Sequence, residues 1–326
     1  MKIAIAGAGM TGAYLYRLLR NRGEAVELFD RPPLLRCGLT PCAWGTCGEF
    51  VHLVREAGLD AERYVLKRLD HLWMDEVKIR AELLTFDKPR LVRDLLAGAE
   101  PRREAFRPEE FERVIDATGV ARALLPPAGD DVVLDCCQYL VETGESLENR
   151  IQLGGIGYAW CFPLGHRRYH LGCGSLFHDP RQRLRRLGWL EDSSGRWPRT
   201  VICGCSGRIR LTGPRQAQPF VAAGGGGEIW GIGEAIGCVA PLAGDGIVPG
   251  MRSVELLLGA WDDADRYRQT VLEEFAWMEA ERGVLDTLRK GRALGLRQAR
   301  VLHRNSRRMG MQVGLREALG LLKNLR

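Results

Sequence analysis

The sequence predicts a mixed α/β (α+β) fold, in which a doubly wound domain is interrupted by an antiparallel β-sheet and followed by a helical C-terminus. Three observations support this prediction. Residues 2–30 alternate strand, glycine-rich turn, helix and strand at the minimal length of a βαβ unit. Residues 132–175 hold short apolar segments separated by turn residues, as antiparallel strands do. After residue 262 the apolar positions follow helical spacing.

A chain of 326 residues is long enough to hold more than one structural unit. Changes in pattern and clusters of turn residues divide it into three regions. We predict a discontinuous α/β domain over residues 1–62, 86–125 and 213–260, an antiparallel domain over 63–85 and 126–212, and a basic helical region over 261–326.

The N-terminal unit begins with a strand over Lys2–Ala6 and the turn GAGMTG. Its glycines have distinct expected tasks: Gly7 permits the tight turn, Gly9 lets a pyrophosphate approach the backbone, and Gly12 lets helix and strand pack closely. The helix N-terminus that follows favours negative charge. A second strand ends at Asp30, 21 residues after Gly9, where a carboxylate can accept hydrogen bonds from a ribose. The unit therefore predicts a dinucleotide site.

The remaining elements are assigned from periodicity and turn residues. Strands are expected over 64–72, 77–84, 113–117, 132–141, 151–162, 169–174 and 229–233, and helices over 88–97, 181–190, 249–258 and most of the chain after 262. The strand over 113–117 stops at Thr118-Gly119, which carries its backbone close to the same site. Residues 31–48 are predicted to form an irregular loop.

A further segment of the site is GIGEAIGCVAPLAGDGIVPGM, over Gly231–Met251. Glu234 is placed to accept hydrogen bonds from ribityl hydroxyls, and the Pro241–Ile247 turn presents backbone amides ahead of a helix N-terminus. The segment resembles the second FAD-binding motif of the p-hydroxybenzoate-hydroxylase-type flavoproteins, in which Gly-Asp-Ala-Ala-Gly precedes Pro-x-x-Gly-x-Gly-Ile. Here Glu234 stands for the usual Asp and Ile236 for the second Ala.

The string GYAWCFPLGHRRYHLGCGS, over Gly157–Ser175, resembles the Tyr-x-Trp-x-Phe-Pro motif and the following glycine-rich strand of the geranylgeranyl reductase family. In strand geometry Tyr158, Trp160 and Phe162 point to one face, where they line an apolar slot or form a buried core face. The resemblance extends from residue 1 to about residue 260. Shorter matches to the same family are Cys37-Gly38, Asp87-Lys88 and Gln138-Tyr139.

The resemblance implies an FAD-dependent oxidoreductase, with a Rossmann-type FAD-binding domain, that reduces carbon–carbon double bonds of prenyl chains in precursors of archaeal-type ether lipids. The alkene would be held against the flavin in a dry apolar slot. The electron donor is left open between a ferredoxin and NAD(P)H. The expected FAD-binding residues are Gly7, Gly9, Met10, Thr11, Gly12, Asp30, Arg31, Cys37, Gly38, Lys88, Ala117, Thr118, Gly119, Gly233, Glu234, Pro241, Ala243, Gly244, Asp245, Gly246 and Ile247. The expected substrate-binding residues are Tyr158, Trp160, Phe162, Pro163 and Gly172.

Three cysteines, Cys37, Cys42 and Cys47, are each separated by four residues in CGLTPCAWGTC. This spacing matches neither plant-type iron–sulfur sites nor zinc sites, so we expect no metal. Cys37 beside the flavin is the candidate catalytic residue, as a proton donor or a substrate contact, and a packed thiol is the alternative. Cys203 and Cys205 are further candidates for the same cavity.

The net charge of +6 is concentrated at one end of the chain. Residues 289–326 contain eleven Arg or Lys and one acid, Glu317. Such a region suits contact with anionic lipid, and a solvated helical face is an equal alternative. Nucleic acid is not expected as a partner, because no binding module is recognisable. We expect a cytoplasmic protein with reduced thiols, peripheral on the membrane if the basic tail binds lipid.

Two other classes of function remain open. One is an aromatic-ring monooxygenase of the same flavin fold, and a related halogenase motif, Trp-x-Trp-x-Ile-Pro, also resembles Trp160–Pro163. The catalytic lysine of a halogenase cannot be placed in this sequence. The other class is a flavin-binding redox-relay protein, whose cysteine loop exchanges electrons with a partner protein and which reduces no prenyl chain.

Overall fold

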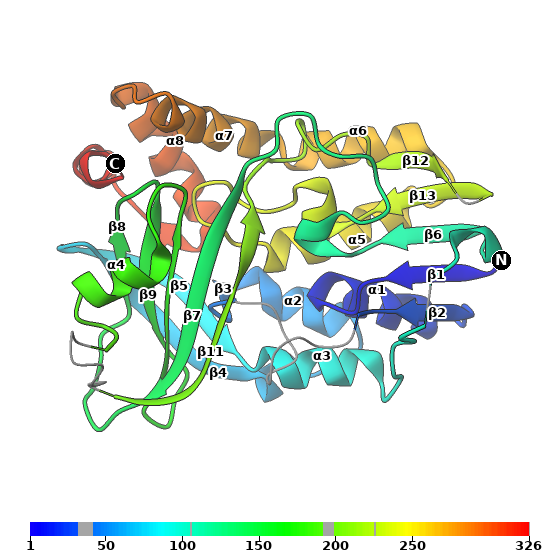
Figure 1. The fold of residues 1–326 in the computed structure, drawn as a ribbon, viewed down its shortest axis with the longest axis horizontal. Coiled ribbons are helices and arrows are strands. Elements are labelled where there is room, and N and C mark those ends of the chain that lie inside the picture. The colour runs from blue at the N-terminus through cyan, green and yellow to red at the C-terminus, as the bar shows by residue number, and fades with distance from the viewer. Residues whose placement is uncertain (32–41, 105, 192–198, 225, 326) are drawn as a thin grey trace.

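The computed structural model describes residues 1–31, 42–104, 106–191, 199–224 and 226–325. Two β-sheets lie beside each other along the long axis of the molecule, with helices packed around them (Figure 1). The first sheet has five strands, in the order β12-β13-β6-β1-β2. These are β1 (Ile3–Ala6), β2 (Val26–Phe29), β6 (Arg113–Asp116), β12 (Val221–Gly224) and β13 (Gly227–Gly231).

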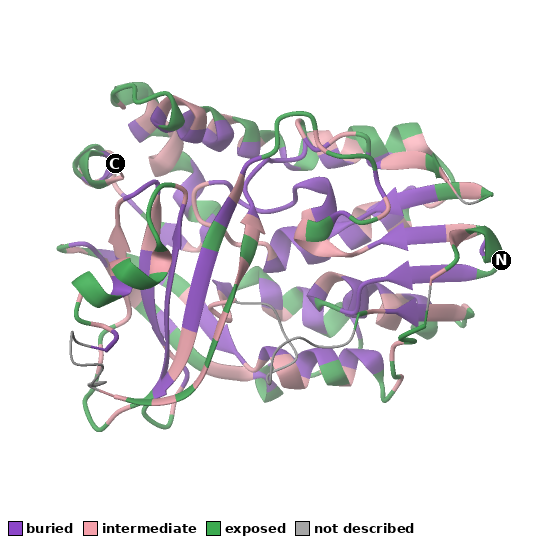
Figure 2. Cartoon of the chain, viewed as in Figure 1, coloured by how far each residue is buried: buried purple, intermediate pink, exposed green. Residues whose placement is uncertain are grey.

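Four strands of this sheet, β2, β1, β6 and β13, are parallel, and β12 runs antiparallel to β13. The apolar strand β1 is buried along its whole length, as a central parallel strand covered on both faces must be (Figure 2). Helices α1 (Met10–Asn21), α3 (Lys88–Leu96), α5 (Ile247–Gly259) and α6 (Ala264–Glu274) pack around the sheet. The doubly wound prediction is confirmed.

The second sheet has nine strands and is almost entirely antiparallel. Its order is β11-β7-β10-β9-β8-β4-β5-β14, and β3 also pairs with β5. Among the described strands of this second sheet, the one parallel pair joins β4 to β8. The strands are β3 (Gly45–Cys47), β4 (Val65–Met74), β5 (Val77–Phe86), β7 (Val133–Glu142), β8 (Arg150–Leu153), β9 (Gly157–Pro163), β10 (Arg168–Ser175), β11 (Thr200–Arg210) and β14 (Met311–Gln312).

The C-terminal region forms α7 (Ala276–Arg289), α8 (Leu296–Ser306) and α9 (Leu315–Leu321). It is part of the body of the molecule, because Met309, Val313 and Leu321 are buried in the same apolar cluster as Trp160 and Phe162. Two further helices are α2 (Glu49–Glu56) and α4 (Pro180–Arg186). No helix among the described residues is long and apolar enough to cross a lipid bilayer.

Several elements differ from the sequence prediction. The strand expected over 151–162 is two strands, β8 and β9, because the backbone turns at Gly154, Gly155 and Ile156, all with positive φ. Helix α2 and strands β3, β11 and β12 were not predicted, and β14 interrupts a tail that was expected to be helical. These strands are short or rich in glycine and cysteine, so their pattern is weak and distant pairing decides their conformation.

The arrangement of the sheets positions the site. The carboxyl ends of β1, β6 and β13 all point toward the nine-stranded sheet (Figure 1). In open α/β sheets, ligands bind outside the carboxyl ends of the strands. The candidate residues that follow these strands therefore meet at the junction of the two sheets.

Candidate functional site

The turn between β1 and α1 has the geometry that its glycines predict. Gly7 has φ +108°, and a Cβ there would lie 2.3 Å from the carbonyl oxygen of Ala117. A Cβ at Gly12 would lie 1.9 Å from the carbonyl oxygen of Gly7. At Gly9, in contrast, a Cβ would meet no atom within 4 Å. Gly7 and Gly12 are thus needed for packing, whereas Gly9 borders open space.

The N-terminus of α1 faces that open space. No side chain caps it, and its first turn, which begins at Met10, contains no acidic residue. The uncapped N–H groups and the positive end of the helix dipole favour an anion there. The Thr11 hydroxyl would lie 2.8 Å from a Cβ at Gly233 and 2.6 Å from one at Gly250, so the Thr11 side chain packs α1 against the start of α5.

Asp30 follows β2 beside this turn, because the N–H of Gly7 donates to the carbonyl oxygen of Phe29 at 2.7 Å. The Asp30 carboxylate accepts a hydrogen bond from the N–H of Arg31 at 2.8 Å. The guanidinium of Arg103 lies 3.8 Å from its other oxygen. Asp30 is half-buried and keeps accepting capacity at the place expected for a ribose contact.

The β6 strand ends in a tightly held turn. The buried carboxylate of Asp116 accepts from the N–H groups of Thr118, Leu124 and Leu125 and from the Thr118 hydroxyl, at 2.6–3.0 Å. This network fixes Ala117 and Gly119, where φ is +65°. Asp116, which was not among the predicted site residues, therefore builds the turn without pointing into the site.

Glu234 lies across from this turn. Its Oε2 would be 3.3 Å from a Cβ at Gly119, and its Oε1 accepts from the N–H of Arg210 at 2.7 Å. Burial raises the pKa of the Glu234 carboxyl, while Arg210 and Lys88 oppose that rise. Lys88 is itself buried at the start of α3. The structure thus places Glu234 against Gly119, and it places Lys88 near enough to act on the charge of Glu234.

The Pro241–Ile247 turn completes this side of the junction. Gly244 has φ +64°, and the Asp245 carboxylate accepts from the N–H of Ile247 at 2.9 Å and from the Thr46 hydroxyl at 3.1 Å. Burial raises the pKa of Asp245 to about 6. Helix α5 begins at Ile247 after Gly246, with no side-chain cap and no acid in its first turn. The Asp245 carboxylate therefore takes the place of a cap at this second helix N-terminus, because it accepts from the first N–H group of α5.

The inner face of the nine-stranded sheet closes the site. Tyr158, Trp160 and Phe162 alternate along β9 and point to one side, as predicted. The Tyr158 hydroxyl donates to the carbonyl oxygen of Ala243, which joins this face to the Pro241–Ile247 turn. Burial, followed by the charge of Asp245, raises the pKa of Tyr158 well above its usual value. Pro163 ends β9, and its carbonyl oxygen accepts from the Thr85 hydroxyl at 2.8 Å.

The Trp160 indole explains why residue 172 is a glycine. It lies opposite Trp160 in the pairing of β9 with β10, and a Cβ there would lie 2.1 Å from the indole ring. The ring therefore lies flat over the glycine, with its Nε1 2.8 Å from that Cβ position. On the other side of Gly172, β7 places Gln138 in register.

Gln138 is a site residue that the sequence analysis did not assign. Trp160 Nε1 and Gln138 Oε1 are both buried and have no hydrogen-bond partner among the described residues. A buried polar atom without a partner is costly, and a bound ligand can supply the missing bond. The sequence carried one signal for this residue, the match of Gln138-Tyr139 to the geranylgeranyl reductase family. The position of Gln138 beside Trp160, however, depends on the register of β7, β10 and β9.

His170 occupies the next row of the same face, opposite Phe162. Its Nδ1 donates to the carbonyl oxygen of Ala43 at 3.2 Å, and its ring packs edge-on against Trp44 at 4.5 Å between centroids. Burial lowers the pKa of His170 to about 4, so the ring is neutral at physiological pH.

The cysteines divide between the two faces of the nine-stranded sheet. Cys37, the predicted catalytic residue, and Gly38 lie outside the described residues. Cys205 is in register with Gln138 and Cys203 with Leu140, which places both on the inner face, as expected. Cys47 is buried beside Asp245, and burial raises the pKa of its thiol to about 12. Within the described ranges, no group of His, Cys, Asp or Glu is arranged to hold a metal ion.

Comparisons with known proteins agree with this architecture. No protein-family model matches the chain. An uncharacterized protein of Methanocaldococcus jannaschii is 23% identical in an alignment 337 residues long, gaps included, that covers 86% of this chain and 90% of that protein.

Solved structures are similar over almost the whole chain. The geranylgeranyl bacteriochlorophyll reductase-like protein of Thermoplasma acidophilum has a TM-score of 0.69 at 16% identity, covering 100% of this chain and 99% of its own. A tryptophan 6-halogenase of Streptomyces toxytricini has a TM-score of 0.67 at 15% identity, covering 99% of this chain and 90% of its own. A probable FAD-dependent monooxygenase of Pseudomonas aeruginosa has a TM-score of 0.55 at 17% identity, covering 93% of this chain and 99% of its own. The predicted fold of FAD-dependent oxidoreductases is confirmed.

The residues at the junction fit FAD. The open space over Gly9 lies at the uncapped end of α1, which suits a pyrophosphate. Asp30 and Glu234 supply hydrogen-bond acceptors at two separate places, as the hydroxyls of a ribose and of a ribityl chain require. The individual contacts to the cofactor, and the boundaries of the predicted domains, stay predictions.

Proposed function

We propose that this protein is an FAD-dependent oxidoreductase that reduces carbon–carbon double bonds of a prenyl chain, with electrons from a ferredoxin or NAD(P)H. The observation that carries the proposal is the aromatic face of β9 against the Pro241–Ile247 turn, joined by the hydrogen bond from Tyr158 to Ala243. An isolated alkene offers no polar group, so an enzyme must hold it by apolar contact. The similarity in fold to a geranylgeranyl bacteriochlorophyll reductase-like protein supports the same class.

The residues of the chain would hold the cofactor between the two sheets. The amides at the start of α1 and the open backbone at Gly9 would contact the pyrophosphate, and Asp30 and Glu234 the sugar hydroxyls. Lys88, which is buried at the start of α3 and lowers the pKa of Glu234 through its charge, would place a positive charge near the cofactor. Reduced FAD would supply the hydride.

The sheet face would orient the substrate and exclude water. Trp160 and Phe162 are buried, and Gly172 leaves room for the indole to lie flat. The Tyr158 hydroxyl keeps its proton, because its pKa is raised, and it holds the turn to the sheet. Cys37 remains our proposed proton donor or substrate contact. Alignment in a dry slot would supply much of the rate enhancement.

An anaerobic experiment tests the proposal. The purified protein is saturated with FAD, reduced with dithionite, and mixed with geranylgeranyl-glyceryl phosphate. We expect the flavin spectrum to return to the oxidised form and the product mass to rise by about two hydrogens for each double bond reduced. A flavin that stays reduced contradicts prenyl reduction and leaves the cofactor intact. A protein that retains no FAD contradicts the flavin assignment itself.

A second candidate, aromatic hydroxylation, is favoured by one observation. A phenol hydroxyl can accept a hydrogen bond from Trp160 Nε1 and donate one to Gln138 Oε1, the two buried atoms without partners. A prenyl chain satisfies neither atom. Phenol-stimulated NADPH oxidation in air, with a hydroxylated product, would identify this activity.

Flavin that is reoxidised by a partner protein, and by neither the prenyl compound nor the phenol, would instead indicate a redox relay.

A further inference from the structure

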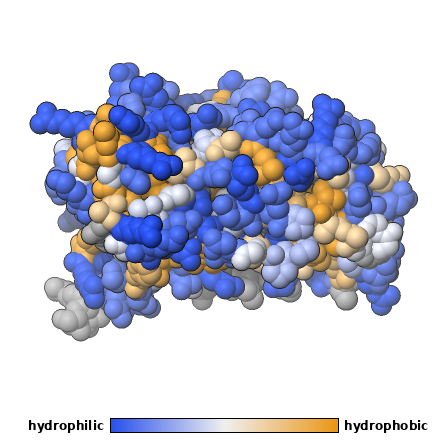
Figure 3. All heavy atoms as spheres, turned by 90° about the horizontal axis from the view of Figure 1, so that it is seen from above, coloured by the Kyte–Doolittle hydropathy of each residue, from blue (hydrophilic) through white to orange (hydrophobic). Residues whose placement is uncertain are grey.

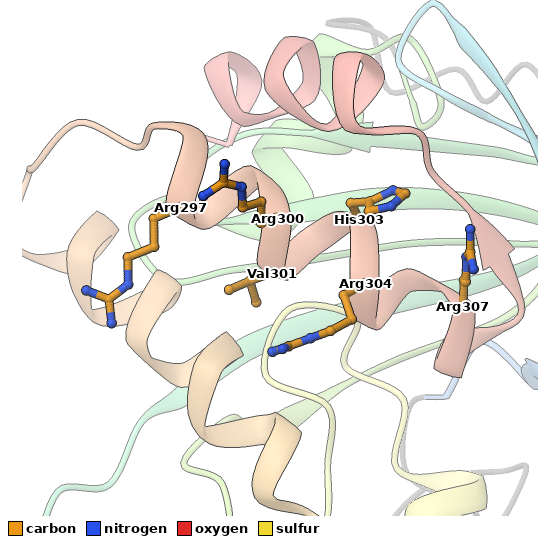
Figure 4. A pocket seen from close by; sticks show the side chains of 6 residues that line it. All are labelled: Arg297, Arg300, Val301, His303, Arg304 and Arg307. Carbon is orange, nitrogen blue, oxygen red and sulfur yellow. The ribbon is translucent and has the colours of Figure 1, made fainter.

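A basic hollow of about 500 Å³ lies on α8 and the turn that follows it, apart from the residues of the flavin site. Figure 4 shows the six side chains that line it, which follow one another along this segment. They are Arg297, Arg300, Val301, His303, Arg304 and Arg307. No acidic residue lines the hollow.

The four arginines of the hollow form no ion pair within the described ranges. These four arginines are exposed, whereas the buried Arg282 lies 2.6 Å from Asp130 and 2.9 Å from Asp286, and the buried Arg210 lies 2.8 Å from Asp131. In the hollow, the ring of His303 is held by donation from Nδ1 to the carbonyl oxygen of Val313 at 2.7 Å. Positive charge is thus collected here without a carboxylate to balance it.

This pattern is unfavourable for the helix on its own. Arg297 and Arg300 are three residues apart, and Arg300 and Arg304 four apart, so like charges are neighbours on one helix face. Arg297 also lies in the first turn, where the helix dipole repels a cation. Arg304, in the last turn, and Arg307, at the C-cap, are favourably placed with respect to the helix dipole. An anion bound in the hollow would remove these repulsions.

We propose that the hollow on α8 is a binding site for phosphate groups. Guanidinium groups are the side chains best suited to phosphate, because each presents a planar pair of N–H donors to two oxygens. The volume is within the range of small-molecule sites. The proposal is independent of the reaction proposed above, because it concerns a separate surface.

Two sources of phosphate suit the surroundings of the hollow. One is a phosphate ester in solution, and the other is the headgroup of an anionic lipid. Leu296 on α8 and Leu319 on α9 are among the most exposed large apolar residues of the chain. Seen from above, the end of the molecule that carries α8 and the C-terminus shows apolar side chains among hydrophilic ones (Figure 3). Such a surface resembles helices that rest on membranes.

The test compares two double variants of the FAD-loaded protein, so that the α1 terminus is filled. Arg300→Gln/Arg304→Gln removes two charges from the hollow. The matched control, Arg22→Gln/Arg186→Gln, removes two exposed arginines outside it. We expect inorganic diphosphate, titrated by calorimetry, to bind the wild type and the control alike and to bind the hollow variant at least tenfold more weakly. Equal affinity in all three proteins, or no saturable binding to the wild type, overturns the proposal.

Thermal unfolding provides a readout that does not depend on titration. Diphosphate should raise the melting temperature of the wild type and the control, and it should leave that of the hollow variant unchanged. The variant without ligand should melt no earlier than the wild type, because the substitutions remove like-charge repulsion. An equal rise in all three proteins places the anion elsewhere and contradicts the site.

The source of the phosphate is distinguished with three probes. A lipid headgroup is identified if the protein sediments with phosphatidylglycerol vesicles and does not sediment with phosphatidylcholine vesicles. The hollow variant should then sediment with neither. Saturable binding of glycerol 3-phosphate without vesicle binding identifies a phosphate ester in solution. Binding of duplex DNA, with no affinity for diphosphate, glycerol 3-phosphate or vesicles, contradicts a phosphate site and indicates a nucleic-acid surface.

Discussion

A single glycine determines whether the aromatic face can form. At Gly172 a Cβ would lie 2.1 Å from the Trp160 indole, so any side chain there must displace the ring. A displacement of this kind would disturb the substrate slot and leave the cofactor contacts, which lie on the other sheet, unchanged.

We therefore predict that Gly172→Ala lowers the rate of prenyl-dependent flavin reoxidation at least tenfold, because misplacing a substrate by about 1 Å can cost about 100-fold. The affinity for FAD, followed by flavin fluorescence, should stay within about twofold of the wild type. The control is Gly144→Ala, where a Cβ meets no atom within 4 Å. A normal reoxidation rate in Gly172→Ala would remove Trp160 from the substrate site.

At the scale of residues, the sequence allowed prediction of those whose role is set by their neighbours in the chain. Gly7, Gly9 and Gly12 belong to one turn, so their spacing predicts their geometry. Gln138 could not be assigned, because its partnerless oxygen follows from the pairing of β7 with β10 and of β10 with β9. Cys37 remains a prediction from sequence alone.

At the scale of elements, the turn between β1 and α1 separates packing from binding. Gly12 is required by the contact with the Gly7 carbonyl, and Gly9 borders open space at the start of α1. The same substitution at these two glycines should therefore have different consequences.

We predict that Gly9→Ala folds normally and binds FAD about tenfold more weakly, because its methyl group occupies the space expected for a pyrophosphate. Gly12→Ala should instead lower the free energy of unfolding by about 3 kcal/mol, because its methyl group meets backbone. FAD titration and urea unfolding measure the two effects. Gly48→Ala, at the start of α2, is the control for Gly9→Ala. Unchanged FAD affinity in Gly9→Ala would place the pyrophosphate elsewhere.

Element boundaries were predictable where local signals coincide. The start of α3 combines Asp87, whose side chain caps Arg90, with Pro89 in the first turn, and the predicted helix is present. The break between β8 and β9 was missed, because Ile156 adopts a positive φ that its side chain disfavours. Backbone hydrogen bonds of Ile156 with Leu325 and Leu176, both at 3.2 Å, hold that conformation.

At the scale of the whole molecule, a buried acid connects the C-terminal helices to the flavin site. Glu281 on α7 is buried, and its carboxylate accepts from the N–H of Leu242 in the Pro241–Ile247 turn at 3.1 Å. Burial raises the pKa of Glu281 to about 7 from 4.5. The folded protein thus holds a proton here that the unfolded chain releases above pH 4.5.

This difference makes stability depend on pH. The contribution of Glu281 is fully present below pH 4.5 and is lost as the pH rises through about 7. We predict that Glu281→Gln, which keeps an acceptor for Leu242, has a free energy of unfolding about 3 kcal/mol above the wild type at pH 8. The two proteins should be equal within error at pH 4.5. Urea unfolding at both pH values measures this, and an equal difference at the two values would show that Glu281 does not titrate in this range.

The whole architecture was predictable in class and only partly in topology. The βαβ opening and the alternating strands indicated a doubly wound domain and an antiparallel sheet, and both are present. The parallel pairing of β4 with β8 and the return of the tail as β14 join residues far apart in sequence. No local pattern encodes such contacts.

The place of β14 has a consequence for any shortened form of this protein. Met311 and Gln312 pair with Ala81 and Arg80, and they cover part of β5. Truncation before residue 311 would leave unpaired N–H and C=O groups along that strand and uncover the apolar side chains packed beneath α9. Such a surface is a template for pairing with another chain. The basic tail therefore also protects the protein from aggregation. The role of its charge is better studied by substituting single residues than by deleting the segment.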